Sequence, residues 1–267
     1  MLSDLIAVAL SATLTVLVAF PLAGALKRHP VPFYAVALAL VVGYLAYQYG
    51  GAYVRGATAV LDVIRKGYLA CMLLAVVMFI GVFDEGSAVR RRLQPVRAEL
   101  SILSSILVLG HVLAYLPIYL PRLGAIFSSH VGMSLAVVVA IVLVVVYALL
   151  SVTSLRAVRT RMPYRTWKGL QRLSYAMVAL LMLHIALALG RPAFAARGSS
   201  TSALVALCVY AVLVVAYTVA RLAKFRRDHR GAALDAARLA DDGAMPHGGA
   251  TPAVRPDDGG ATPGSRG

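Results

Sequence analysis

The sequence predicts an all-α integral membrane protein, a bundle of seven transmembrane helices. Of the 267 residues, 60% are hydrophobic and only 14% are charged, whereas about a quarter of the residues in a typical soluble domain are charged. The mean hydropathy is +0.81. A helix needs roughly 20 apolar residues to cross a bilayer. The stretches that approach this length are 5–26, 31–49, 68–83, 100–120, 131–154, 170–190 and 202–223.

The first apolar stretch, residues 5–26, predicts a retained helix. A secretory signal peptide carries basic residues before its apolar segment. Here Lys27 and Arg28 follow the stretch instead of preceding it. We therefore expect residues 1–30 to form an extra N-terminal transmembrane helix.

Two loops separate the next helices. Residues 50–66 contain three glycines and the amphipathic stretch ATAVLDVIRK, which predicts an outer loop with a short interfacial helix. The third stretch, 68–83, is the shortest of the seven. The charged loop 84–99 contains Pro95, which interrupts any continuous helix because proline lacks the backbone N–H.

The positive charge lies in alternate loops. The net charge of +15 is therefore better explained by the positive-inside rule than by nucleic-acid binding. With seven spans, this pattern predicts a cell (inner) membrane protein with its N-terminus outside and its C-terminus in the cytoplasm. The basic residues of the predicted cytoplasmic loops are Lys27, Arg28, Arg90, Arg91, Arg92, Arg97, Arg156, Arg159, Arg161, Arg165, Lys168, Arg221, Lys224, Arg226, Arg227 and Arg230.

After Lys224 the composition changes to a tail rich in Gly, Pro and Asp. Such a segment buries too little apolar surface to fold alone. We expect residues 226–267 to form a cytoplasmic, largely disordered tail with one short helix near 231–241. We interpret the tail as a solvated end without a functional site.

His111 and His184 are the most informative residues, because each lies in a long apolar run. An unpaired polar group in hydrocarbon costs several kcal/mol, so an intramembrane histidine is a candidate functional residue. In the predicted topology both helices run in the same direction. His111 lies 14 residues beyond Arg97, about 21 Å, and His184 lies 16 residues beyond Lys168, about 24 Å. The two imidazoles are therefore expected at similar depth in the outer half of the membrane.

Two facing histidines on neighbouring helices can supply both axial ligands of a b-type haem. The alternative is that His111 and His184 each hydrogen-bond a neighbouring polar group and simply join helices. Zinc is disfavoured, because no Cys, Asp or Glu accompanies them at that depth.

The other histidines and cysteines are weaker candidates. His130 is the one further ligand candidate. No Cys-x-x-Cys or Cys-x-x-Cys-His motif occurs, which disfavours a disulfide scaffold and covalently attached haem. We expect interfacial or solvated positions for His29, His229 and His247, and small buried positions for Cys71 and Cys208.

Two segments carry a family resemblance. They are RRRLQPVRAELSILSSILVLGHVLAYL at 90–116 and TSLRAVRTRMPYRTWKGLQRLSYAMVALLMLHIAL at 153–187. Through them, residues 51–224 resemble the ferric-reductase-like transmembrane family, most closely the haem-binding membrane subunits of bacterial periplasmic methionine sulfoxide reductase systems. The resemblance implies a six-helix haem-binding domain within 31–225, with His111 and His184 as the haem ligands.

One position departs from the family pattern. Gln171 occupies the place of the inner histidine, and Arg97 and Ala98 stand at the equivalent depth on the earlier helix. The resemblance therefore implies one haem b on the outer side and no usual ligand for a second. The positions that agree with the pattern are Thr153, Ser154, Trp167, Leu170 and Tyr175.

The leading hypothesis is a b-type haem electron-transfer subunit. It would pass electrons from a quinol or flavin donor to an outer acceptor, either a separate reductase or flavoprotein subunit or ferric iron. No Gly-x-Gly-x-x-Gly motif occurs, so we expect no nicotinamide site of its own. Quinone or FMN is the expected further cofactor. Arg165, Lys168 and Arg172 either attract a flavin phosphate or anchor the helix at the membrane surface.

Two alternatives stay open. The first is a non-redox permease or scaffold that keeps the fold without functional haem, and Gln171 is its main support. The second is a redox or haem sensor that signals through residues 231–267. The expected partners are the lipid bilayer and the separate subunit, without nucleic acid.

Overall fold

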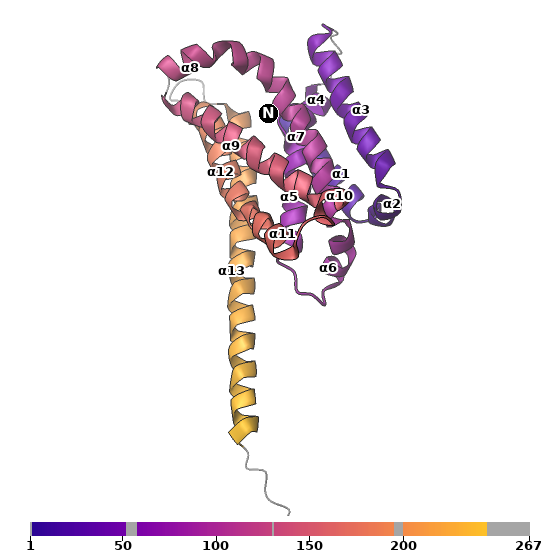
Figure 1. The fold of residues 1–267 in the computed structure, drawn as a ribbon. Helices are drawn as coiled ribbons and strands as arrows, with labels where there is room; N and C mark the ends of the chain where they lie inside the picture. Colours follow the sequence, from indigo (N-terminus) through magenta and orange to yellow (C-terminus); the bar gives the residue numbers. More distant parts are fainter. Residues whose placement is uncertain (1, 52–57, 130, 195–199, 245–267) are drawn as a thin grey trace, which may run out of the picture. The chain divides into compact units, whose positions relative to one another are not determined.

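The chain is all-α, as predicted, in the computed structural model, which describes residues 2–51, 58–129, 131–194 and 200–244 (Figure 1). No strand occurs in these ranges. The α-helices are α1 (Leu2–Ala19), α2 (Ala23–Arg28), α3 (Pro30–Tyr49), α4 (Thr58–Arg65), α5 (Tyr68–Ile80), α6 (Ala88–Leu93), α7 (Arg97–Tyr119), α8 (Leu123–Ser129), α9 (Val131–Ser154), α10 (Arg156–Arg159), α11 (Tyr164–Gln171), α12 (Leu173–Ala193) and α13 (Thr201–Ala244).

The helices make this a multi-pass membrane protein. Each of the seven predicted stretches holds a helix. Two of these are apolar but shorter, Ser3–Ala19 and Tyr68–Ile80. Large apolar side chains such as Val131 and Ile141 are exposed on α9, as expected of a surface that contacts lipid tails. Within the described residues, five segments are long and apolar enough to span a membrane: Pro30–Tyr49, Ala88–Ser128, Val131–Ser154, Tyr164–Ala193 and Ala203–Gly231.

The predicted boundary of the first helix was wrong. α1 ends at Ala19, and a turn separates it from the short helix α2. The reason is Pro21, which has no N–H to donate and disfavours helical backbone at the preceding residue. Pro95 acts as predicted, because it lies in the 3-10 turn Gln94–Val96 between α6 and α7.

The short helix predicted within 50–66 is present as α4, and one side of it packs into the core. In α4, Asp62, Val63 and Ile64 are buried. This helix packs against α1, α5 and α7. Its amphipathic pattern therefore reflects contact with protein on its buried side, and its place at the membrane surface stays a prediction. Residues 52–57 of the predicted loop lie outside the described residues.

The chain divides into two compact units, Met1–Lys224 and Phe225–Gly267. The separate short helix predicted near 231–241 was wrong, because α13 is one continuous helix from Thr201 to Ala244. Residues 221–244 are rich in Ala, Arg and Leu, which have high helix propensity, and Gly231 in their middle is not enough to end the helix. The disorder predicted for 245–267 concerns residues outside the described part of the chain.

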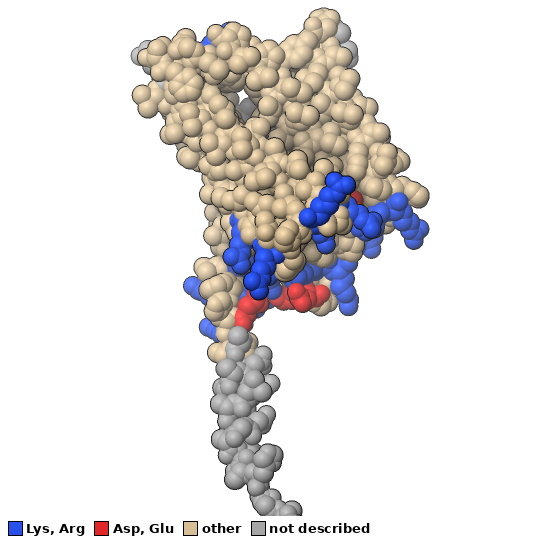
Figure 2. Space-filling view, viewed as in Figure 1, with Lys and Arg blue, Asp and Glu red and all other residues tan. Residues whose placement is uncertain are grey.

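Basic side chains gather at one end of the first unit. Figure 2 shows most Lys and Arg side chains of this face in one band, at the end where Figure 1 places α2, α6, α10 and α11. This grouping follows from the alternation of basic loops along the sequence. That this end faces the cytoplasm stays a prediction from the positive-inside rule.

The core of the first unit forms around α7. This helix packs against α3, α5, α4 and α9, and its side chains Leu100, Leu103 and Leu107 are buried. Gly110 is buried where α7 meets α3 and α4. A Cβ added there would lie 2.8 Å from Val41 Cγ2 and 3.1 Å from Ile64 Cγ2. The glycine therefore allows three helices to meet directly beside His111.

Gly110→Val is expected to lower the free energy of unfolding by about 1–3 kcal/mol, the usual cost of overpacking a core. Unfolding in mixed dodecyl maltoside and SDS micelles measures this. Gly43→Val is the matched control, because Gly43 is exposed on α3 and a Cβ there meets no atom within 4 Å. Equal losses in both variants would show that helix propensity, not packing, sets the cost.

Candidate functional site

His111 lies on α7 against the turn that joins α4 to α5. Its Nδ1 lies 2.6 Å from the backbone oxygen of Arg65. Gly67 in the same turn has a φ of 70°, a left-handed conformation that favours glycine. A Cβ at Gly67 would come within 3.5 Å of His111 Nδ1. The turn thus holds the imidazole both by a hydrogen bond and by close packing.

This hydrogen bond determines which ring nitrogen of His111 carries the proton. A carbonyl oxygen only accepts, so Nδ1 must be the donor at this contact. In the neutral imidazole, Nε2 then keeps its lone pair. A backbone carbonyl behind one ring nitrogen is the usual arrangement of a metal-binding histidine. His111 is therefore oriented as a ligand through Nε2.

His184 lies on α12 and is half-buried. Its Nδ1 is buried and has no hydrogen bond of good geometry to the described residues, although the backbone of Ala136 on α9 interacts with the ring. The two imidazoles are close enough to interact electrostatically. The two histidines singled out by the sequence thus lie in one region of the fold.

A buried ionic cluster lies behind the turn at Arg65. Lys66 bonds to Asp4 of α1 and lies 3.0 Å from Asp62 of α4. Burial alone would lower the pKa of Lys66, but its hydrogen bonds to Asp4 and Asp62 outweigh this, and the pKa lies above its usual value. The Lys66 amine therefore keeps its positive charge, and its bond to Asp4 links α1 to the turn that orients His111.

An aromatic and cationic border surrounds the His111 ring. The Tyr115 ring lies edge-on to the imidazole with centroids 5.1 Å apart. The Arg65 side chain interacts with Tyr115 and is half exposed, 4.0 Å from Asp62. The site therefore offers one cation that is only weakly paired, next to the candidate ligand.

Hydroxyl groups connect α5, α7 and α9 about two helical turns before His111 on α7. Ser104 donates to the backbone oxygen of Ala70 at 2.7 Å and lies 2.6 Å from the Tyr147 hydroxyl. Ser105 and Ser151 lie 2.6 Å apart. These bonds join α5, α7 and α9 and satisfy polar groups that would be costly to leave unpaired in the core.

The residues of the family pattern on α9 and α11 also come together. Trp167 Nε1 donates to the Thr153 backbone oxygen at 3.1 Å, and Gln171 Nε2 donates to Thr153 Oγ1 at 3.2 Å. Gln171 thus uses its amide to join two helices. Gln171 therefore stands at the position of the family's inner histidine without offering an imidazole ligand there.

Gln171 also borders a cavity of about 350 Å³ at the end that carries the basic band. Arg97 and Ala98 line it as well, as expected from their depth on α7, together with Arg159 and Arg221. We call it the basic cavity. Its lining contains no His or Cys, so the residues that form it offer no imidazole or thiolate ligand for a second haem.

The remaining predicted side chains do not join the histidine pair. Cys71 is half-buried, whereas Cys208 is exposed, so the predicted burial of Cys208 was wrong. His29 and His229 are exposed, as predicted. His130 and His247 lie outside the described residues. No group of three or more His, Cys, Asp or Glu that could hold a metal ion occurs in the described part of the chain.

Sequence reasoning missed the residues that position His111. They are the Arg65 carbonyl, Gly67, Tyr115 and Lys66. A glycine directly after an amphipathic helix that ends in Arg-Lys is a signal for a left-handed turn. That signal locates the turn but not the histidine that packs on it.

Comparison with known proteins finds a family match over the middle of the chain. Residues 66–182 match the family described as ferric reductase like transmembrane component. The match includes His111 and ends two residues before His184. An uncharacterized protein of Treponema pallidum (strain Nichols) is 33% identical over 178 residues, which cover 66% of this chain and 48% of that protein. The chain thus spans about half the length of the curated relative.

Proposed function

We propose that this chain, whose residues 66–182 match the ferric reductase like transmembrane component family, is the b-type haem subunit of a membrane electron-transfer system. His111 and His184 would hold its iron. It passes electrons from a quinol or flavin donor to an acceptor on the other side of the membrane. The acceptor is a separate reductase subunit, as in the methionine sulfoxide reductase systems that the chain resembles, or ferric iron.

The observation that carries this proposal is the hydrogen bond between His111 Nδ1 and the Arg65 carbonyl at 2.6 Å. A histidine that only joins helices uses whichever nitrogen finds a partner. Here the bond to a rigid turn leaves Nε2 as the basic nitrogen, which is what an iron ligand requires.

His184 and the helix packing support a ligand between the two rings. The buried Nδ1 of His184 has no hydrogen-bond partner among the described residues, so this atom is left for a ligand even though the Ala136 backbone of α9 interacts with the ring. α7 and α12 each pack against α9, but they are not among the helix pairs that pack extensively against each other in the described residues. This arrangement is compatible with a planar group between them.

A haem held there would supply a one-electron iron couple, whose potential depends on its ligands, their hydrogen bonds and burial. The residues of the chain have separate tasks. His111 and His184 hold the iron, and the Arg65 carbonyl orients one of them. The Arg65 guanidinium offers a partner for a propionate.

The charge pattern gives the orientation of the chain in the membrane. The basic end faces the cytoplasm under the positive-inside rule, so the histidine pair lies in the outer half of an inner membrane, with the N-terminus outside. The donor then approaches from the basic end or from within the membrane.

The haem-to-protein ratio of the purified chain, combined with a redox titration, tests the proposal. We expect one haem b per chain, a reduced spectrum with the Soret and alpha bands of a b-type cytochrome, and a single one-electron wave. Well-folded protein without haem, purified from haem-replete cells, would instead favour the non-redox permease or scaffold.

A further inference from the structure

Hydroxyl and thiol side chains form a line through the core of the first unit, between the basic cavity and the ionic cluster of Lys66. An apolar core of this kind usually keeps few polar side chains, because each of them must be paired. We call this set the hydroxyl line. Its members, in order from the basic cavity, are Ser151, Ser105, Tyr147, Ser104, Cys71, Tyr210 and Tyr68.

The line begins at two serines next to the basic cavity. Ser151 and Tyr147 are part of the lining of that cavity. Ser105 lies 2.7 Å from the Ser101 backbone oxygen, Ser151 lies 2.7 Å from the Tyr147 backbone oxygen, and the two serine hydroxyls lie 2.6 Å apart. Each hydroxyl has one hydrogen, so two hydrogens serve three contacts. Rotation of a hydroxyl is therefore enough to move a hydrogen bond along the line.

Tyr147 and Ser104 carry the line toward α5. A carbonyl oxygen only accepts, so Ser104 donates to Ala70 and the Tyr147 hydroxyl donates to Ser104 Oγ. Tyr147 also interacts with Ser105 on one side and with the Cys71 thiol on the other. This tyrosine therefore joins the serine pair near the basic cavity to the middle of α5.

Tyr210 has a buried hydroxyl without a protein partner of good geometry. Tyr210 is only 6% exposed, and among the described residues no acceptor or donor satisfies its hydroxyl. A cavity of about 50 Å³ lies between α5, α12 and α13, and Cys71 and Tyr210 both line it. A buried water molecule needs roughly 10–15 Å³ and polar partners. The cavity thus has room for water beside the hydroxyl and the thiol.

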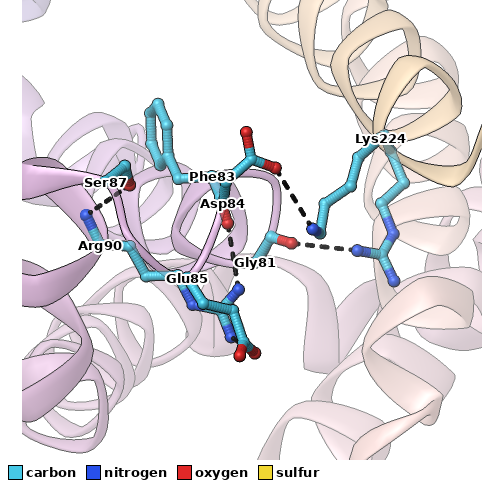
Figure 3. Close-up of polar contacts among 8 residues, drawn as sticks. Gly81, Phe83, Asp84, Glu85, Ser87, Arg90 and Lys224 are labelled. Atoms are coloured by element: carbon cyan, nitrogen blue, oxygen red, sulfur yellow. Dashed lines mark hydrogen bonds and ion pairs between the residues drawn. The ribbon is translucent and has the colours of Figure 1, made fainter. Parts of the chain in front are cut away.

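The position of Tyr210 beside α5 is fixed by contacts at the basic end of α13. Figure 3 shows Lys224 of α13 directed toward Asp84 in the loop after α5, with a nitrogen to oxygen distance of 3.6 Å. Arg221 donates to the Gly81 backbone oxygen at 3.0 Å. These contacts join α13 to the end of α5, so Tyr210 stays next to the other members of the line.

Tyr68 connects the line to the end of the unit opposite the basic cavity. Its ring centroid lies 6.2 Å from that of Tyr210, and its side chain interacts with Lys66 and both aspartates of the ionic cluster. The Lys66 side chain is 28% exposed, so the cluster reaches the surface. The adjoining turn packs against His111, which lies 14 residues, about 21 Å, along α7 from Arg97 at the basic cavity.

We propose that the hydroxyl line, completed by water beside Cys71 and Tyr210, conducts protons between the basic cavity and the ionic cluster of Lys66. Each member accepts a proton from one neighbour and releases its own to the next, so only O–H and S–H bonds form and break. At the cluster a carboxylate accepts the proton and passes it to water. Ionisable side chains in series within a membrane are typical of proton relays. The proposal goes beyond electron transfer and does not depend on haem.

A proton-flux assay with the full-length protein in liposomes tests the proposal. The liposomes contain K⁺, valinomycin sets an inside-negative potential, and quenching of an acridine dye reports proton uptake. We expect faster uptake than in protein-free liposomes. Tyr147→Phe and Tyr210→Phe keep the ring and remove only the hydroxyl. Each should slow the protein-dependent uptake at least about 10-fold, because a proton at the interrupted position lacks a hydrogen-bond partner.

Tyr164→Phe is the matched control. Tyr164 is 67% exposed on α11 and does not belong to the line, so this variant should conduct protons as the original protein does. Size-exclusion profiles and thermal unfolding check that the three variants fold. Uptake no faster than in protein-free liposomes overturns the proposal. So does unchanged uptake in a folded Tyr147→Phe or Tyr210→Phe protein, or an equal loss in Tyr164→Phe.

Discussion

Replacing either His111 or His184 with alanine is expected to abolish haem binding. Even substitutions in the shell behind a metal ligand cost about 10–100-fold in metal affinity, so loss of an axial ligand should exceed that. The protein should lose its reduced Soret and alpha bands when purified from haem-replete cells. Pyridine haemochrome analysis, normalised to protein, measures the loss.

His29→Ala is the control, because His29 is exposed between α2 and α3 and should leave the haem content unchanged. Size-exclusion profiles separate loss of haem from loss of fold. His111→Gln serves as a second variant that keeps a polar side chain facing the Arg65 carbonyl. A monodisperse His111→Ala or His111→Gln protein with full haem content would rule out His111 as a ligand.

The helical architecture was predictable because lipid leaves the backbone no other partner than itself. In a bilayer every N–H and C=O must be satisfied within the segment, so hydropathy alone located a helix in each of the seven apolar stretches, five of them long enough to span a membrane. Their ends were less predictable. Pro21 ended α1 early, and the Ala-rich segment after Lys224 extended α13 to Ala244, because local propensity decides where apolar composition does not.

The two histidine side chains of the site were predictable from the sequence, but the backbone group that orients His111 was not. An imidazole in an apolar run stands out in a sequence, which is why His111 and His184 could be named. The group that orients His111 is a backbone carbonyl, and every residue has one. Only the fold determines that Arg65, 46 positions away, supplies it.

The basic cavity illustrates the same limit. The sequence showed that Gln171 replaces a histidine and that Arg97 stands at the same depth. It did not show that Gln171 would bond to Thr153, or that the carboxylates of 84–99 would pair with other cations. Charge compensation depends on side-chain positions across several helices, and the order of charges along the chain does not encode them.

Lys66→Met is expected to lower the free energy of unfolding by about 3 kcal/mol. Removing one partner of a buried ion pair leaves the other charge uncompensated, at a cost of about 3–5 kcal/mol. Here Lys66 pairs with both Asp4 and Asp62, whose side chains are 4% and 10% exposed. The lower end of the range applies because the Lys66 side chain itself is 28% exposed.

The consequence should extend to His111. Lys66 follows Arg65 directly, so a loosened turn moves the carbonyl that orients the imidazole, and the haem potential should shift with the ligand hydrogen bond. Unfolding in mixed micelles and a redox titration measure the two effects. Arg91→Met removes one positive charge from an exposed position on α6 and should change neither the stability nor the haem potential.

The triple variant Lys66→Met, Asp4→Asn, Asp62→Asn should regain most of the stability, because replacing a buried charged set as a whole is far less costly than breaking it. An unstable triple variant would show that Lys66 stabilises the turn by packing instead of by charge.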